Sequence, residues 1–196
     1  MMTALRIHPE LVTYLDRLVG VLTDAVEIEA VYLVGSAALG AYEHGHSDVD
    51  VVAVTSGSLS ADELRALAAA AEALPVPARK LELVVYPRGS DRWELNLNTP
   101  DGDEATHLGL NPDQEPTFWF VLDRAIAEQH AVPLLGPPWA ELFEPVSREA
   151  IEAALDEGAA FDGWSEANAA LAGVRGRAWR ETGHWISKPE ARERLR

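Results

Sequence analysis

Two aspartates separated by a single residue could do chemistry, because they interrupt an apolar stretch. Asp48 and Asp50 flank Val49, and the apolar run 51–54 follows directly. Side chains two apart on a strand leave the same face of the sheet. Two carboxylates on one face repel each other unless a cation lies between them, and Mg²⁺ prefers such oxygen ligands. The pair therefore predicts a Mg²⁺ site, where two ions would clamp both sides of an in-line phosphoryl displacement.

A glycine–serine pair precedes the aspartates and could hold a phosphate. Gly35 and Ser36 follow the apolar run 30–34, which has the pattern of a buried strand. Glycine lets the backbone approach a phosphate closely, and the free N–H groups at the start of a helix favour an anion. Ser36 adds a hydroxyl donor. We expect a short helix over 36–42 with Ser36 as its N-cap.

Glu82 supplies a third carboxylate, in the predicted strand 80–86. Its neighbours Leu81 and Leu83 would point to the opposite face, into the core, which leaves Glu82 on the polar face. Three carboxylates on adjacent strands are enough for two metal ions, or for metal ions and a general base. Each of these carboxylates alone is explained as simply by a solvated strand face, and it is their combination that favours a metal site.

The remaining pattern predicts the elements that must position these residues. Periodicity and turn residues indicate a sheet-bearing part followed by helices only. We therefore expect an α+β fold, with a mixed β-sheet and helices over residues 1–142 and a small all-α domain over residues 143–196. The proline-rich stretch 131–147 holds the boundary. Predicted strands lie at 30–34, 48–54 and 80–86, with an edge strand at 93–97. Predicted helices lie at 9–23, 36–42, 60–74 (capped by Ser60), 116–130, 147–159, 165–182 and 188–195.

The composition excludes several classes of protein. The chain of 196 residues has no cysteine, which excludes disulfides and thiol catalysis, and a net charge of −16, which argues against a nucleic-acid partner. Apolar runs are too short for a membrane span, and the N-terminus lacks a secretory pattern, so we expect a cytoplasmic protein. Residues 1–164 carry a net charge of −19 and residues 165–196 one of +3. This basic segment is either an anion site or a solvated helix face.

Four stretches together resemble one enzyme family. YLVGSAALGAYEHGHSDVDVVAV is similar to the signature of nucleotidyltransferases with a polymerase-β-type core, a GS pair followed by DxD. LELVVYPR, FWFVLDRAIAEQHAVPLLGPPWAELFEPV and NAALAGVRGRAWRETGHWISKPEA resemble, more narrowly, the streptomycin/spectinomycin adenylyltransferases. The resemblance covers nearly the whole chain from about residue 30. Its first motif is specific for the superfamily, and the last makes the narrower family the leading interpretation.

The resemblance assigns roles to eight residues. It implies that Gly35 and Ser36 hold the triphosphate of ATP, and that Asp48 and Asp50 bind two Mg²⁺ ions. Glu82 would be the third metal-site carboxylate or the base that accepts a proton from the acceptor hydroxyl. From the helical domain, three further residues would meet the ATP phosphates: Asn168, Arg175 and Lys188. The alternative for these three is structural, with Asn168 at a helix cap, Arg175 on the surface and Lys188 at the start of a helix.

The resemblance also implies an activity: transfer of AMP from ATP to a hydroxyl of a small cationic aminoglycoside-type acceptor, with release of pyrophosphate. An acidic cleft would suit such an acceptor. We expect a monomer. Two alternatives stay open, namely a nucleotidyltransferase for another acceptor (lincosamide-like, or a protein side chain) and a non-catalytic, antitoxin-like interaction protein. Members of this family usually continue with further helices after the SKPEA stretch, which indicates a shortened or truncated helical domain here.

Overall fold

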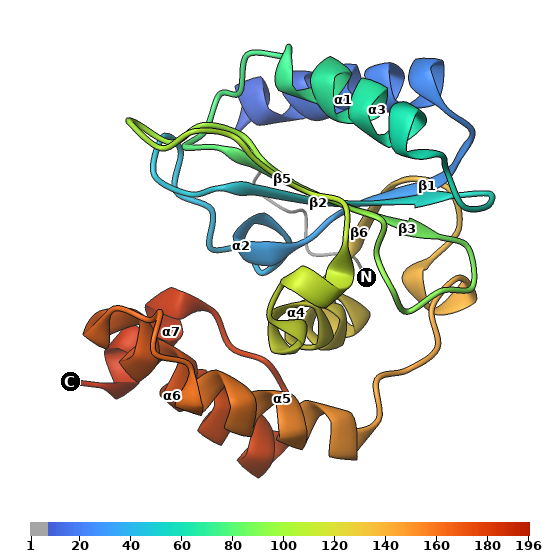
Figure 1. Cartoon of the computed structure of the whole chain (residues 1–196). Coiled ribbons are helices and arrows are strands. Elements are labelled where there is room, and N and C mark those ends of the chain that lie inside the picture. The colour runs from blue at the N-terminus through green and yellow to red at the C-terminus, as the bar shows by residue number, and fades with distance from the viewer. Residues whose placement is uncertain (1–7) are drawn as a thin grey trace.

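A mixed six-stranded sheet forms the centre of the molecule, and a group of helices follows it (Figure 1). The computed structural model describes residues 8–196. The predicted α+β fold is confirmed. The strands are β1 (Ile28–Leu33), β2 (Val49–Thr55), β3 (Leu81–Pro87), β4 (Leu95–Asn98), β5 (His107–Gly109) and β6 (Val132–Leu135). The helices are α1 (Pro9–Ala25), α2 (Gly35–Ala38), α3 (Ala61–Glu72), α4 (Thr117–His130), α5 (Arg148–Ala160), α6 (Glu166–Thr182) and α7 (Lys188–Arg194), with 3₁₀ turns η1 (Pro112–Gln114) and η2 (Trp139–Glu141).

The sheet order β5-β4-β3-β2-β1-β6 places β2 and β3 at its centre. These two strands run parallel, whereas the other neighbouring pairs are antiparallel. Parallel neighbours begin at the same edge of a sheet, so the residues near the start of β2 lie beside those near the start of β3. The register pairs Asp50 with Glu82. The topology therefore brings together two of the carboxylates that the sequence singled out.

The two faces of the sheet are covered by different helices (Figure 1). Helices α1 and α3 lie on one face, where side chains such as Leu18, Leu67 and Leu83 are completely buried in one apolar cluster. Helices α2 and α4 lie on the other face. Because side chains alternate along a strand, Leu81 and Leu83 point into the first cluster and Glu82 lies on the face of α2 and α4. This confirms the alternation predicted for residues 80–86.

The predicted N-cap of one short helix is right and that of another is wrong. Ser60 caps α3, with its side chain and that of Glu63 forming a reciprocal capping box. Ser36, in contrast, caps nothing, because α2 begins one residue earlier, at Gly35, after Val34. The chain passes straight from β1 into this turn through the positive φ of Gly35, 61°. Ser36 therefore lies inside α2, and its hydroxyl is released from the capping role.

The proline-rich segment 131–147, in which we placed the domain boundary and no strand, contributes a strand to the sheet. β6 pairs antiparallel with β1 and places Val132 opposite Leu33. The glycine that follows, Gly136, packs so closely on β1 that a Cβ atom there would lie 2.3 Å from the carbonyl oxygen of Glu29. The segment thus closes one edge of the sheet before the chain turns to the C-terminal helices.

Helices α5, α6 and α7 follow as a layer on the far side of α4 (Figure 1). A separate apolar cluster joins them to α4, with Ile126 of α4 buried among Ile151, Trp179 and Trp185. The rings of Trp179 and Trp185 stack with centroids 5.6 Å apart. The division of the chain at residue 142 stays a prediction. Within residues 8–196, none of the helices combines the length and the apolar character needed to cross a membrane.

Candidate active site

Asp50 and Glu82 form the centre of the candidate site, as neighbours on the parallel strands β2 and β3. Burial raises the pKa of the Asp50 carboxyl well above its ordinary value, and the adjacent Glu82 carboxylate raises it further. Asp123 and Asp48 act on it in the same direction. So much negative charge around one partly buried acid is costly without a cation. The site therefore has the electrostatics of a cation-binding centre.

Gly35 lies directly against Asp50. A Cβ atom at residue 35 would lie 1.9 Å from Oδ2 of Asp50, so that any side chain would displace the carboxylate. The backbone N–H of Val34 also donates to the carbonyl oxygen of Asp50 at 2.9 Å, which ties the β1–α2 turn to β2. We expected Gly35 to allow a close approach that only glycine permits. The structure shows such an approach between Gly35 and Asp50.

Ser36 provides an unpaired hydroxyl beside this turn. Its Oγ atom is buried and has no hydrogen-bond partner among the described residues. Buried hydroxyls are usually paired, so an unpaired one next to a strand edge with carboxylates indicates a partner that the polypeptide does not supply. A phosphate oxygen, which we predicted Ser36 to contact, would be one such partner.

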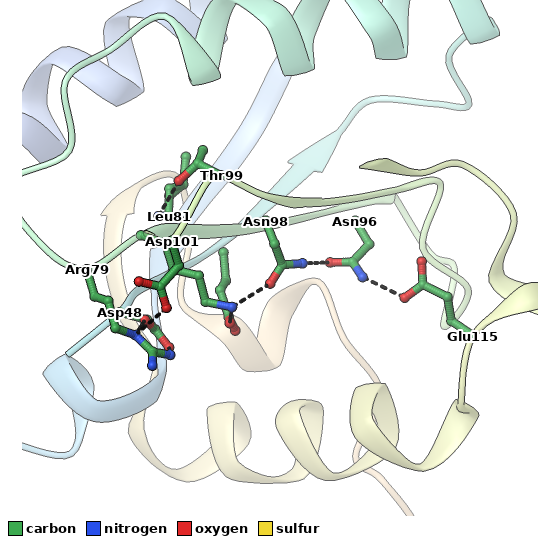
Figure 2. A network of polar contacts seen from close by, with 10 residues as sticks. Asp48, Arg79, Leu81, Asn96, Asn98, Thr99, Asp101 and Glu115 are labelled. Carbon is green, nitrogen blue, oxygen red and sulfur yellow. Dashed lines mark hydrogen bonds and ion pairs between the residues drawn. The ribbon is translucent and has the colours of Figure 1, made fainter. Parts of the chain in front are cut away.

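Asp48 lies just before β2 and is held by an arginine that the sequence analysis did not single out. Nε and Nη2 of Arg79 donate to its two carboxylate oxygens at 2.8 and 2.9 Å, and Nε also lies 3.3 Å from Asp101 (Figure 2). Arg79 immediately precedes Lys80 and strand β3. The Arg79 guanidinium therefore neutralises the negative charge of Asp48.

Lys80 plays the corresponding role for Glu82, with Nζ 2.7 Å from Oε1. The same ammonium donates to Asn98 at 3.2 Å (Figure 2). From there a chain of hydrogen bonds runs along the sheet, from Asn98 to Asn96 at 3.2 Å and from Asn96 to Glu115 at 2.6 Å. The orientation of Glu82 on β3 is therefore linked to β4 and to Glu115, which follows the 3₁₀ turn η1. The signal available in the sequence was an adjacent Arg–Lys pair within residues 1–164, which carry a net charge of −19.

The carboxylates of the candidate site suit a divalent metal ion in their chemistry. In this structure, however, the side chains of Arg79 and Lys80 set the positions of two of them. The donor set of Asp48, Asp50 and Glu82 is all oxygen, as Mg²⁺ requires. Their ligand atoms do not all lie within 4.8 Å of one another. Asp48 is turned towards Arg79 and Glu82 towards Lys80, and these ion pairs must give way or shift for one ion to contact all three carboxylates.

Asp123 of α4 faces the carboxylates from the helical side and was missed by the sequence analysis. Desolvation by the surrounding protein atoms, together with the negative charge of Glu82, raises the pKa of Asp123 to about 7. The side chain nevertheless keeps some contact with solvent. The positive charges of Arg175 and Lys188 lower the same pKa. A single acid between Leu122 and Arg124, in a largely apolar helix, was the signal available in the sequence. The Asp123 carboxyl thus experiences both the negative charge of Glu82 and the positive charges of the C-terminal helices.

The three residues expected from the C-terminal helices differ in their surroundings. Arg175 of α6 is half-buried, and its Nε donates to the carbonyl oxygen of Ile186 at 2.8 Å, so it also holds the segment that leads to α7. Burial lowers the pKa of Arg175 and Asp123 raises it. Lys188 is the exposed first residue of α7. Asn168 is exposed in the first turn of α6, where its backbone N–H donates to Ser165. Among the described residues, no hydrogen bond or ion pair joins the Asn168 side chain to the carboxylates.

Comparisons with known proteins find one family match and one structural similarity. Residues 15–102 match the family model of the nucleotidyltransferase domain, and this stretch contains five of the predicted site residues, Gly35, Ser36, Asp48, Asp50 and Glu82. The fold is similar to a crystal structure of spectinomycin adenyltransferase AAD(9) from Enterococcus faecialis with ATP and spectinomycin. The TM-score is 0.68 at 15% identity, over 93% of this chain and 79% of that one. No curated protein matches the chain in a sequence comparison. Residues 15–102 are therefore similar to a nucleotidyltransferase domain.

Proposed function

We propose that the protein transfers AMP from ATP to a hydroxyl group of a small cationic acceptor of the aminoglycoside type, similar to streptomycin or spectinomycin, with release of pyrophosphate. The observation that carries the proposal is the pairing of Asp50 with Glu82 in a nucleotidyltransferase domain, beside a glycine whose place no other residue can take. This is an arrangement for holding a metal–nucleotide complex next to a carboxylate that can accept a proton.

Each carboxylate has a distinct part in the proposed reaction. Asp48 and Asp50, with Glu82 as the third oxygen donor, would hold Mg²⁺, which neutralises charge on the phosphates during transfer. Glu82 accepts the proton of the acceptor hydroxyl. The hydroxyl oxygen then bonds to the α-phosphorus of ATP, and the bond from that phosphorus to pyrophosphate breaks. Lys80 orients the Glu82 carboxylate through its 2.7 Å ion pair before the substrates bind.

The nucleotide would be held both from the sheet and from the C-terminal helices. Gly35 and Ser36 offer backbone approach and a free hydroxyl from the sheet side. Arg175 and Lys188 bring positive charge from α6 and α7, and their effect on Asp123 supports a position close to the carboxylates. Asn168, also expected to meet the phosphates, requires a shift of the first turn of α6 towards the nucleotide. ATP would thereby draw the C-terminal helices onto the sheet.

The acceptor class follows from charge. Residues 1–164 carry a net charge of −19, which favours a cationic ligand over an anionic one. The loop after β4 adds Asp101, Asp103 and Glu104, the first of which reaches Arg79 beside Asp48. The similarity of the fold to a spectinomycin adenyltransferase supports the same direction.

A panel of acceptors tests the proposal. Purified protein is incubated with ATP, Mg²⁺ and single candidates (streptomycin, spectinomycin, a lincosamide, a protein mixture), and pyrophosphate release is measured, with Asp50→Asn as the inactive control. Release that depends on streptomycin or spectinomycin supports the proposal. Release with a lincosamide, or AMP-labelled protein instead, overturns the acceptor class but not the transferase. ATP binding without release for any acceptor favours the non-catalytic interaction protein.

A further inference from the structure

A second group of ligating side chains lies apart from the three carboxylates, where the start of α1 meets the loop between α2 and β2. His8, Glu10 and His44 each offer one ligand atom, and these atoms all lie within 4.8 Å of one another. His8 is the N-cap residue of α1, Glu10 is in its first turn, and His44 lies in the loop. Two segments distant in sequence thus bring two imidazoles and one carboxylate close together.

The contacts within this group bring its members close to the geometry of a metal site. Nε2 of His44 lies 3.3 Å from a carboxylate oxygen of Glu10, and the rings of His8 and His44 stack with centroids 3.9 Å apart. Ligand atoms around a tetrahedral Zn²⁺ ion with bonds of about 2.0–2.2 Å are roughly 3.4 Å apart. The His44–Glu10 pair already has that separation. The His8 and His44 rings are within 15° of parallel, so the His8 ring must turn towards the ion before its nitrogen can bind it.

The ligand types select a transition metal and not Mg²⁺. Imidazole nitrogen suits Zn²⁺ and its neighbours in the transition series, whereas Mg²⁺ is held by oxygen ligands. The Glu10 side chain is 67% exposed and that of His44 39%, so an ion from solution can reach them. The partial positive charge at the start of α1 disfavours a cation. The Glu10 carboxylate offsets that charge, which makes it as important to the site as the two histidines.

We propose that His8, Glu10 and His44 form a Zn²⁺ site, with water completing the coordination, that fastens the α2–β2 loop to the start of α1. The loop leads directly to Asp48 through a closed turn, in which the Ser47 N–H donates to the Glu43 carbonyl at 2.8 Å and Ser47 Oγ accepts from the Glu43 N–H at 3.0 Å. Because His44 belongs to this turn, a bound ion restrains the backbone that carries Asp48. The proposal does not depend on the transfer reaction.

Zinc binding to the nucleotide-free chain tests the site. The protein, freed of any affinity tag and of metal, is titrated calorimetrically with Zn²⁺ in the presence of millimolar Mg²⁺. We expect one Zn²⁺ per chain, bound at micromolar or lower concentration, and a higher melting temperature with Zn²⁺. His8→Ala, His44→Ala and Glu10→Gln should each weaken binding by roughly tenfold or more, since loss of a supporting partner alone has about that effect in metal sites.

His46→Ala is the matched control, because His46 lies exposed in the same loop but outside the group. It should keep the wild-type affinity. Circular dichroism and melting of the metal-free variants show that they fold. Absence of Zn²⁺ binding by the wild type overturns the proposal. An unchanged affinity in His44→Ala, or an equal loss in His46→Ala, overturns it as well.

Discussion

A Cβ atom on Gly35 would lie 1.9 Å from Oδ2 of Asp50, so the β1–α2 turn and the central carboxylate occupy adjoining space with no room between them. Gly35 also has a positive φ of 61°, which other residues adopt only with strain. Two independent requirements therefore meet at one glycine: a backbone conformation, and the absence of a side chain. The two can be separated by experiment.

Gly35→Ala should lose ATP binding in the presence of Mg²⁺ as well as stability. Gly40→Ala is the matched control, because Gly40 has a φ of 70° and an added Cβ there meets nothing within 4 Å. The control should show only the backbone strain, about 1 kcal/mol of unfolding free energy, with ATP affinity retained. Chemical denaturation and nucleotide titration compare the two. Equal behaviour of both variants would contradict the contact between Gly35 and Asp50.

Asp50→Asn should abolish transfer and yet stabilise the metal-free protein at neutral pH. The pKa of Asp50 is raised in the folded protein, so folding disfavours its ionised form. Below the unfolded pKa the acid is protonated in both states and there is no penalty. As the pH rises from there towards the folded pKa, the wild type loses stability and the asparagine variant does not. Denaturation in EDTA across this window measures the difference, and a difference independent of pH would refute the explanation.

Asp48→Asn should also abolish transfer but destabilise the protein. Asp48 accepts two hydrogen bonds from Arg79, and its neutral analogue weakens a bidentate ion pair that the wild type possesses. The two aspartates are thus expected to share a function and to have opposite effects on stability. Parallel turnover and denaturation measurements on both variants check this, and wild-type turnover in either would remove the metal assignment.

Glu82→Gln should preserve ATP affinity but slow transfer by roughly a hundredfold or more, the usual scale for loss of a general base. Nucleotide titration and single-turnover rates separate the two effects. If ATP affinity falls as steeply as the rate, Glu82 acts chiefly as a metal ligand. In that case the base must be sought among the other carboxylates of the cleft, of which Asp123 is the first candidate.

Arg79→Gln should lower the Mg²⁺ concentration required for ATP binding. The Arg79 guanidinium competes with a metal ion for Asp48, and an exposed ion pair contributes about 0.2–1 kcal/mol, so the shift should be roughly up to fivefold. Arg88→Gln is the control, since it removes the same charge and a comparable ion pair, Arg88 to Glu29 at 2.9 Å, at the opposite end of β3. A Mg²⁺ requirement that changes equally in both variants would reflect net charge alone.

Lys188→Ala should weaken ATP binding by roughly tenfold or more, because a hydrogen bond to a charged group contributes about 1.5–3 kcal/mol. Arg192→Ala removes an exposed charge from the same helix and should have little effect. We also expect the cationic acceptor to bind only after ATP, since closure of α6 and α7 completes its site. Calorimetry with acceptor alone should show little heat, and full acceptor binding without nucleotide would contradict this order.

The sequence by itself determined most of the elements and three carboxylates of the candidate site, those of Asp48, Asp50 and Glu82. Alternation in residues 80–86 put Glu82 opposite Leu81 and Leu83, because successive side chains of a strand point to opposite faces. The unbroken apolar runs marked β1 and β2, because both faces of these strands are buried. The GS and DxD motifs were visible for the same local reason, since a turn and a polar interruption depend on nearby residues only. Turn chemistry also predicted the Ser60 cap of α3 correctly.

Tertiary structure alone decided which residues meet. That β6 would pair with β1 could not be read from four residues among prolines, because strand pairing depends on distant partners. Asp123, Arg79 and Lys80 carry no motif, and their importance comes from lying beside Asp48, Asp50 and Glu82 once the parallel pair has formed. The Gly35 contact and the approach of His8 to His44 arise in the same way. Charge and close packing act through space, and a sequence records distance only along the chain.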